Sequence, residues 1–206
     1  MNYFKQIGIK ALKQTLRLLD KQTPKTIFNL NEYGIALIKE FEKLRLKSYD
    51  DGFGYLTIGW GHTSDKYFKV NQNQVITEEK ANELLKYDIE QDAINLLNRE
   101  LLYEELLDNF QYSALVSLVY NSGSFKIKVN GRWIPSPLMI ALNNKEFTKA
   151  GELIKSHDIR VRGKVLLGLR RRRLCEYWLY TRYRVNEMKP SVWAKEIRLK
   201  AEKLLT

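Results

Sequence analysis

The chain has little cysteine and histidine and no long apolar run. Its single cysteine, Cys175, cannot form a disulfide within the chain and suits synthesis in a reducing cytoplasm. Two histidines are too few for a zinc site that has no further cysteine ligands. The longest stretch without a charged residue, 109–125, contains several polar side chains, which indicates a buried helix and argues against a membrane span.

Internal repeats, low-complexity tracts, phosphate-binding loops and serine-nucleophile elbows are also absent from the sequence. We therefore expect neither a metal nor a cofactor. Residues 1–21 hold apolar residues separated by lysines and an arginine, without the contiguous apolar core and small-residue cleavage site of a secretory signal. They predict a basic amphipathic helix that packs on its own domain, with binding to a membrane surface as the alternative.

Positive charge is concentrated at the two ends of the chain, whose formal net charge is +11. Residues 1–30 hold six basic residues and one acidic residue, a net +5, and residues 158–206 hold fourteen and five, a net +9. Basic ends can contact nucleic acid, an anionic membrane or the acidic polymers of a bacterial envelope. Charge alone does not choose among these partners.

Residues 37–63, LIKEFEKLRLKSYDDGFGYLTIGWGHT, contain the most informative pattern. Apolar residues recur at helical spacing up to Glu42, and Asp51 follows in a turn rich in aspartate and glycine. The run 55–62 then alternates as a strand does, with its even-numbered residues on the face that we expect to be buried. The other face carries Thr57 among glycines, which lets a bulky ligand approach the backbone. We therefore expect Thr57 to line a cleft.

Two carboxyl groups in different surroundings, with a hydroxyl group nearby, suit the hydrolysis of a glycosidic bond. One acid must donate a proton to the leaving oxygen, while the other stays ionised to activate water or to stabilise the sugar cation. Glu42 on a partly apolar helix fits the proton donor, and Asp51 in a polar turn fits the ionised partner. An ordinary helix end followed by an ordinary turn would show the same spacing, so the spacing alone is not specific.

The segment 41–63, FEKLRLKSYDDGFGYLTIGWGHT, resembles the motif of the phage-type lysozymes, glycoside hydrolase family 24. In this motif Glu, Asp and Thr are separated by eight and then five residues. Glu42, Asp51 and Thr57 match this spacing without a gap. The sequence goes on to resemble later helices of the family, in the same order, at residues 76–89, 109–123, 137–143 and 163–176. The resemblance therefore covers most of the chain.

This resemblance implies an α+β, lysozyme-like fold with a small β-containing lobe, a larger helical lobe and the active-site cleft between them. It implies that Thr63 and Tyr120 contact the sugar, although a core tyrosine with a satisfied hydroxyl is the alternative for Tyr120. His62 falls on the buried strand face and needs a polar partner there. The family places an aspartate at the position of Asp88, so we expect a structural His62–Asp88 ion pair.

The implied function is hydrolysis of the β-1,4 bond between N-acetylmuramic acid and N-acetylglucosamine in peptidoglycan, by a phage endolysin. Such an enzyme would stay in the host cytoplasm until lysis, and a separate pore-forming protein would then let it reach the periplasm and cell wall. We expect a monomer without a nucleic-acid partner. The rival hypotheses are a virion-associated murein-degrading enzyme, a lytic transglycosylase, and an inactive module that binds murein or nucleic acid.

Three parts of the chain are expected: a basic extension at 1–28, a lysozyme domain at 29–180 and a basic helical extension at 181–206. The local patterns predict helices over 77–98, 109–123 and 138–154 and after Pro190, with a loop or small hairpin within 125–136. Residues 170–173, four arginines in a row, are expected on a solvated helix face, with contact to a peptide stem or a catalytic acid as the alternative.

Overall fold

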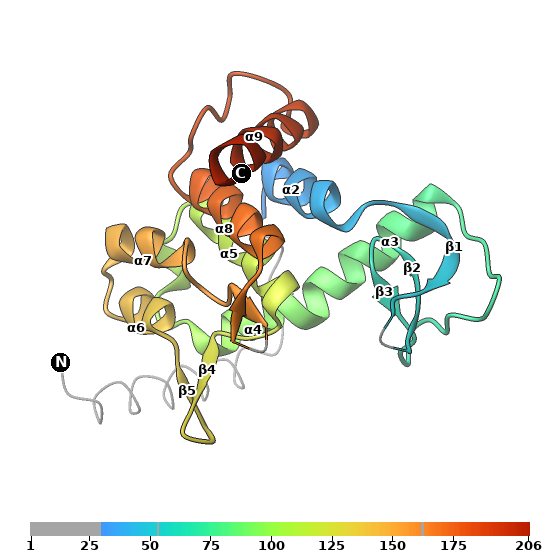
Figure 1. The fold of residues 1–206 in the computed structure, drawn as a ribbon, viewed down its shortest axis with the longest axis horizontal. Coiled ribbons are helices and arrows are strands. Elements are labelled where there is room, and N and C mark those ends of the chain that lie inside the picture. Colours follow the sequence, from blue (N-terminus) through green and yellow to red (C-terminus); the bar gives the residue numbers. More distant parts are fainter. Residues whose placement is uncertain (1–29, 53, 162) are drawn as a thin grey trace.

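The structure, a computed structural model, describes residues 30–52, 54–161 and 163–206. The basic extension expected at residues 1–28, with its helix at 1–21, lies outside this part. Figure 1 shows a small lobe that holds strands β1 to β3 and a larger lobe made mostly of helices, joined by a long helical segment that begins with α3. The predicted α+β, lysozyme-like architecture is confirmed.

The small lobe is a three-stranded antiparallel sheet in the order β1-β2-β3. Its strands are β1 (Arg45–Asp50), β2 (Leu56–Gly59) and β3 (His62–Thr63). Thr57 of β2 lies opposite Tyr49 of β1 on one side and opposite Thr63 of β3 on the other. Ile58 and His62 are buried, which confirms the predicted inner face of the strand.

A continuous helical segment connects the lobes. It consists of α3 (Glu78–Asp88), the π-helical turn η1 (Ile89–Ile94) and α4 (Asn95–Glu100). The side chain of Thr77 caps its start by accepting a hydrogen bond from the backbone of Lys80, and two acidic residues follow in the first turn. The predicted helix start is therefore confirmed, and the segment ends two residues beyond the predicted Asn98.

Helix α5 (Asn109–Ser122) forms the centre of the larger lobe, and α2 (Glu32–Glu42) and α8 (Leu167–Tyr180) pack against it. Asp108 begins α5 with a capping box, and Gly123 ends it in the left-handed conformation. Ala114, Leu115, Leu118 and Val119 of α5 are all buried, which confirms the buried helix predicted from the uncharged stretch 109–125. Within the described residues, no helix is both long enough and apolar enough to span a bilayer.

Shorter elements complete the larger lobe. They are the 3₁₀ turn η2 (Glu104–Leu106), strands β4 (Lys126–Val129) and β5 (Arg132–Pro135), helices α6 (Pro137–Asn143) and α7 (Phe147–Ile154), and strands β6 (Arg160–Val161) and β7 (Lys164–Val165). The hairpin expected within 125–136 is present, whereas the single helix predicted over 138–154 is wrong. Two helices form because Lys145 adopts a φ of 62° and the Asn143 side chain binds backbone groups near the end of α4.

The C-terminal helix α9 (Pro190–Leu205) packs against α2 and α8, and it begins with its proline as predicted. Trp193 is fully buried and meets the ring of Tyr33 edge-on. Arg198 forms an ion pair with Glu40 of α2 at 2.5 Å. Helix α9 is therefore part of the core of the larger lobe, and it supports the helix that carries the first predicted catalytic acid.

Candidate active site

Glu42 is the last residue of α2, at the point where the chain leaves the larger lobe for the small one. The buried Leu37 and Ile38 fix the inner face of this helix, and Asn31 caps its start. The Glu42 side chain is 24% exposed. Its carboxylate lies beside Gly61, where a Cβ would stand 3.6 Å from Oε2. The acid is therefore held between the lobes and remains accessible to solvent.

An arginine from α8 holds the Glu42 carboxylate in place. Arg172 Nη1 donates to Glu42 Oε1 at 2.6 Å, and Arg172 Nε donates to Glu176 Oε1 at 3.3 Å. Glu176 is fully buried and also accepts a hydrogen bond from Arg173. The solvated face predicted for residues 170–173 is wrong for Arg172 and Arg173, which are both buried. They lie inside because the buried charge of Glu176 requires cationic partners.

Asp51 lies in the turn after β1, where the main chain fixes it. Its N–H donates to the Tyr55 carbonyl oxygen at 3.1 Å, and its Oδ1 accepts from the Tyr55 N–H at 3.1 Å. Gly52 and Gly54 have φ angles of +82° and +92°, a backbone shape that other residues rarely adopt. The turn predicted here is therefore present.

The charges of both acids affect the pKa of the Tyr49 hydroxyl in β1. Burial raises the pKa of its hydroxyl, the guanidinium of Arg45 lowers it, and the negative charges of Glu42 and Asp51 raise it further. Arg45 lies over the Tyr49 ring, 4.3 Å from its centroid. Both predicted catalytic acids therefore lie within electrostatic range of one hydroxyl group.

Thr57 is only 4% exposed, so the prediction that it lines an open cleft is wrong for this structure. Tyr49 and Thr63 lie beside it on the same face of the sheet and cover it. The glycines were expected to let a ligand approach the backbone, and this expectation is also wrong at Gly59. A Cβ added there would stand 3.3 Å from the Cβ of Ala81. This glycine lets helix α3 approach the sheet, and it does not admit a ligand.

A polar pocket of about 400 Å³ lies where the two lobes meet. The predicted site residues that line it are Glu42, His62, Thr63, Asp88 and Tyr120. Asp51 and Thr57 do not contribute to this lining. The Tyr120 hydroxyl donates to the Trp60 carbonyl oxygen at 3.3 Å, and burial raises the pKa of this hydroxyl far above its usual value. Tyr120 therefore has a satisfied hydroxyl and also lines the pocket.

The expected contact between His62 and Asp88 is present at this pocket. His62 Nδ1 lies 2.8 Å from Asp88 Oδ1, and His62 Nε2 lies 3.3 Å from the Phe68 carbonyl oxygen. Burial by itself lowers the pKa of His62, but the hydrogen bond and charge of Asp88, the Phe68 carbonyl and the charge of Asp65 together raise it above its usual value. The pair joins β3 to α3.

Two polar features of the site were not predicted. Asp92 lines the pocket, and burial together with the nearby charges of Asp88 and Asp65 raises its pKa. Its position four residues after Asp88 on one helix was a usable signal. The second feature is the ion pair between Arg172 and Glu176. These residues are also four positions apart on one helix, α8, and this spacing could have predicted their pairing.

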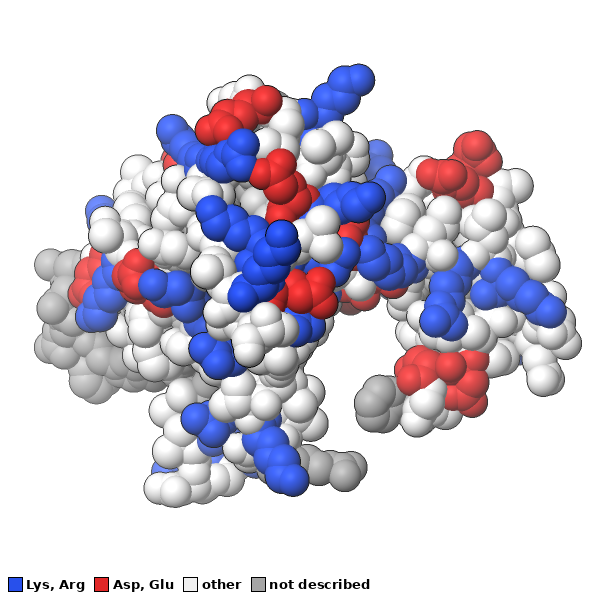
Figure 2. All heavy atoms as spheres, turned by 45° about the horizontal axis from the view of Figure 1, so that its top comes forward, with Lys and Arg blue, Asp and Glu red and all other residues white. Residues whose placement is uncertain are grey.

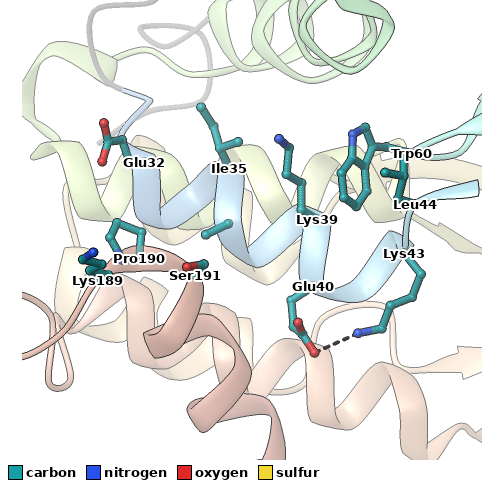
Figure 3. A pocket seen from close by; sticks show the side chains of 11 residues that line it. Glu32, Ile35, Lys39, Glu40, Lys43, Leu44, Trp60, Lys189, Pro190 and Ser191 are labelled. Atoms are coloured by element: carbon teal, nitrogen blue, oxygen red, sulfur yellow. Dashed lines mark hydrogen bonds and ion pairs between the residues drawn. The ribbon is translucent and has the colours of Figure 1, made fainter. Parts of the chain in front are cut away.

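A larger hollow of about 730 Å³ lies between α2 and the start of α9 (Figure 3). Lys39 extends there beside the Trp60 ring, with its Nζ 5.0 Å from the centroid, and Glu40 pairs with Lys43. Glu42, the first predicted catalytic residue, lines the smaller polar pocket and does not line this hollow. We therefore assign the site to the smaller pocket.

A small sheet lobe, a helical lobe and an interlobe pocket with a glutamate at a helix end define the class of lysozyme-like proteins. Comparison with protein families agrees, because residues 39–176 match the family described as phage lysozyme. The chain belongs to the phage lysozyme family.

Individual relatives support the same assignment. The chain is 36% identical over 155 residues to the endolysin of Acyrthosiphon pisum secondary endosymbiont phage 1, a match that covers 74% of this chain and 97% of that protein. It is 36% identical over 133 residues to the endolysin of Salmonella phage P22, covering 61% and 81% of the two chains. The crystal structure of a P22 lysozyme mutant matches with a TM-score of 0.60 at 29% identity, covering 74% of this chain and 98% of that one. The resemblance found in the sequence is confirmed.

Proposed function

We propose that this protein is a lysozyme that hydrolyses the β-1,4 bond between N-acetylmuramic acid and N-acetylglucosamine. As a phage lysozyme it is a peptidoglycan glycosidase of the endolysin type, and the proposal adds the bond that it cleaves and the residues that act. The observation that carries the proposal is the polar interlobe pocket, in which Arg172 holds the carboxylate of Glu42 beside Gly61.

In the proposed reaction Glu42 donates a proton to the leaving glycosidic oxygen. Asp51 remains ionised in its polar turn and activates the attacking water, which leads to inversion at the sugar carbon. Thr57 helps to hold that water. Its hydroxyl donates a long hydrogen bond of 3.4 Å to the Tyr55 carbonyl oxygen, and it can bind the water once the neighbouring side chains part on substrate binding.

The substrate contacts and the histidine pair complete the proposal. Thr63 is exposed on β3 and Tyr120 lines the same pocket from α5, so the two reach a sugar from opposite lobes. His62 and Asp88 act as a structural tie between the small lobe and the interlobe helix, outside the chemistry itself.

The proposed setting is the bacterial cell wall, with peptidoglycan as substrate. The enzyme stays in the host cytoplasm until lysis and then reaches the periplasm, where it works as a monomer without nucleic acid. Its basic ends contact anionic membrane or envelope polymers. The boundaries proposed for the lysozyme domain are 29 and 180, and the extension after residue 180 adds helix α9 to the core of its larger lobe.

Digestion of purified peptidoglycan tests this function. The full chain should clear a peptidoglycan zymogram, and mass analysis should find hydrated reducing ends on N-acetylmuramic acid. Anhydro ends would identify a lytic transglycosylase instead. A folded protein that binds peptidoglycan without clearing it would be an inactive binding module.

A further inference from the structure

The hairpin of β4 and β5 projects from the larger lobe, away from its core (Figure 1). Its strands pair in register, with Lys128 opposite Trp133. Asn130 and Gly131 form the tip with φ angles of +49° and +79°, the two positive values that a type I′ turn requires. The tip therefore has a preformed shape that holds its side chains out in solvent.

Both faces of this hairpin expose large apolar side chains. Trp133 is 63% exposed on one face, and Val129 and Ile134 are 43% and 41% exposed on the other. The charged residues of the hairpin are Lys126, Lys128 and Arg132. Residues 125–136 contain no acidic side chain. The hairpin therefore combines exposed apolar surface with charge of one sign.

A second, shorter hairpin of β6 and β7 repeats this composition. The two hairpins begin next to each other in space. His157 lies just before β6 and Phe125 lies just before β4, and their rings meet edge-on with centroids 6.1 Å apart. Val161 and Val165 are exposed on the second hairpin, which also carries an exposed basic residue on each strand. Figure 2 shows basic side chains on the part of the larger lobe that projects downward, and both basic and acidic side chains on the rest of this lobe and on the small lobe.

We propose that these two hairpins, which we call the hairpin surface, dock the protein onto an anionic lipid bilayer. Their cations attract lipid phosphate groups, and the tryptophan and aliphatic side chains enter the interface, where tryptophan is favoured. A glycan strand of peptidoglycan would contact one face of a two-stranded ribbon and leave the other exposed. A bilayer interface surrounds both faces, and it therefore fits the apolar residues on both.

This membrane contact goes beyond the proposed function and does not depend on it. The described residues of the hairpin surface do not line the pocket of Glu42. Docking would hold the enzyme at a membrane next to its wall substrate, while the chemistry remains in the interlobe pocket. Loss of docking and loss of cleavage can therefore be measured separately.

Tryptophan fluorescence of the full chain gives a direct test. All four tryptophans lie in the described part of the chain, and Trp133 is exposed whereas Trp60, Trp178 and Trp193 are buried. Vesicles of phosphatidylglycerol and phosphatidylcholine should shift the emission to shorter wavelength, with a weaker shift at high salt and none with phosphatidylcholine alone. Trp133→Ala should abolish the shift.

Charge reversal with a matched control locates the contact. The double variant K128E/R132E should lower affinity for the anionic vesicles at least about tenfold, because two interfacial cations are lost. The control K66E/K69E makes the same change in net charge at two exposed small-lobe lysines and should change affinity less than about twofold. Both variants should keep their circular dichroism and their clearing of peptidoglycan.

Four results would overturn the proposal. The full chain could fail to bind anionic vesicles, or it could bind them without a shift from Trp133, which would place the contact at the basic ends. Equal losses in the two double variants would show that only net charge matters. Loss of binding to purified peptidoglycan in K128E/R132E, with vesicle binding unchanged, would make the hairpin surface a wall contact instead.

Discussion

The two lobes hold their proposed catalytic acids in opposite ways. In the larger lobe, side chains fix Glu42: Arg172 binds it and is itself tied to the buried Glu176. In the small lobe, Asp51 exchanges two hydrogen bonds with the main chain of Tyr55 in a glycine-rich turn. One acid is therefore positioned by an ion network, and the other by the shape of the backbone.

This difference suits the two chemical tasks. A proton donor and an ionised partner need different surroundings, and placing them on different lobes lets each surrounding be built independently. It also predicts different consequences of substitution. Changes in the ion network should disturb the fold and Glu42 together, whereas changes at Asp51 should disturb the reaction and leave the fold intact.

The largest expected effect is at the proton donor. Glu42→Gln keeps the shape of the side chain but removes the proton, so turnover on peptidoglycan should fall by about a hundredfold to ten-thousandfold. The matched control is Glu40→Gln, two residues earlier on the same helix and bound to Lys43 and Arg198. It should keep most of the activity, and substantial turnover by Glu42→Gln would remove Glu42 from the mechanism.

The next effect concerns the network behind Glu42. Arg172→Met leaves Glu176 with one cationic partner fewer in a buried site, so the free energy of unfolding should fall by about 3 kcal/mol in a denaturant titration. Arg171→Met removes the neighbouring arginine, whose pair with Glu202 lies near the surface, and should cost about 1 kcal/mol or less. Similar losses in the two variants would show that the network does not stabilise the larger lobe.

Asp51→Asn should lower turnover by about a hundredfold if the carboxylate activates water as a general base. Its melting temperature should stay close to that of the unchanged protein, because an asparagine Oδ1 can still accept the hydrogen bond from Tyr55. This outcome separates Asp51 from Arg172, whose loss lowers stability. Near-normal turnover would reduce Asp51 to a contributor of local charge.

The smallest effect depends on pH and concerns the tie between the lobes. The folded-state pKa of His62 is raised above its unfolded value of about 6.5, so the charge pair with Asp88 stabilises fully at lower pH and fades as pH rises through the folded pKa. His62→Asn should therefore lower the melting temperature more at pH 5 than at pH 9, and it should spare the chemical step. Equal losses at both pH values would contradict the ion pair's role.

Local sequence signals predicted much of the fold. Thr77 marks a helix start, and the apolar spacing before Glu42 marks a packed helix, because capping and periodicity act over a few residues. The break between α6 and α7 was missed. It depends on the left-handed Lys145 and on contacts of Asn143 with a helix about forty residues earlier, which no local pattern reveals.

Part of the pocket lining was predictable from the sequence, whereas the burial of Thr57 was not. The spacing of the motif pointed to Glu42 and Asp51, but the burial of Thr57 depends on side chains from the two neighbouring strands. The partner of Glu42, Arg172, lies 130 residues away in the sequence. Both features come from contacts between distant segments, and these are set by packing of the whole chain.

The stereochemistry of cleavage tests most directly the claim that the two acids have different tasks. A soluble murein oligosaccharide should be cleaved in an NMR tube, with the anomeric proton of the new reducing end read before mutarotation. If Asp51 activates water while Glu42 donates the proton, the first product is the α anomer. A β anomer as first product would mean that the configuration is retained and that a carboxylate attacks the sugar, which would contradict the roles proposed for the two acids.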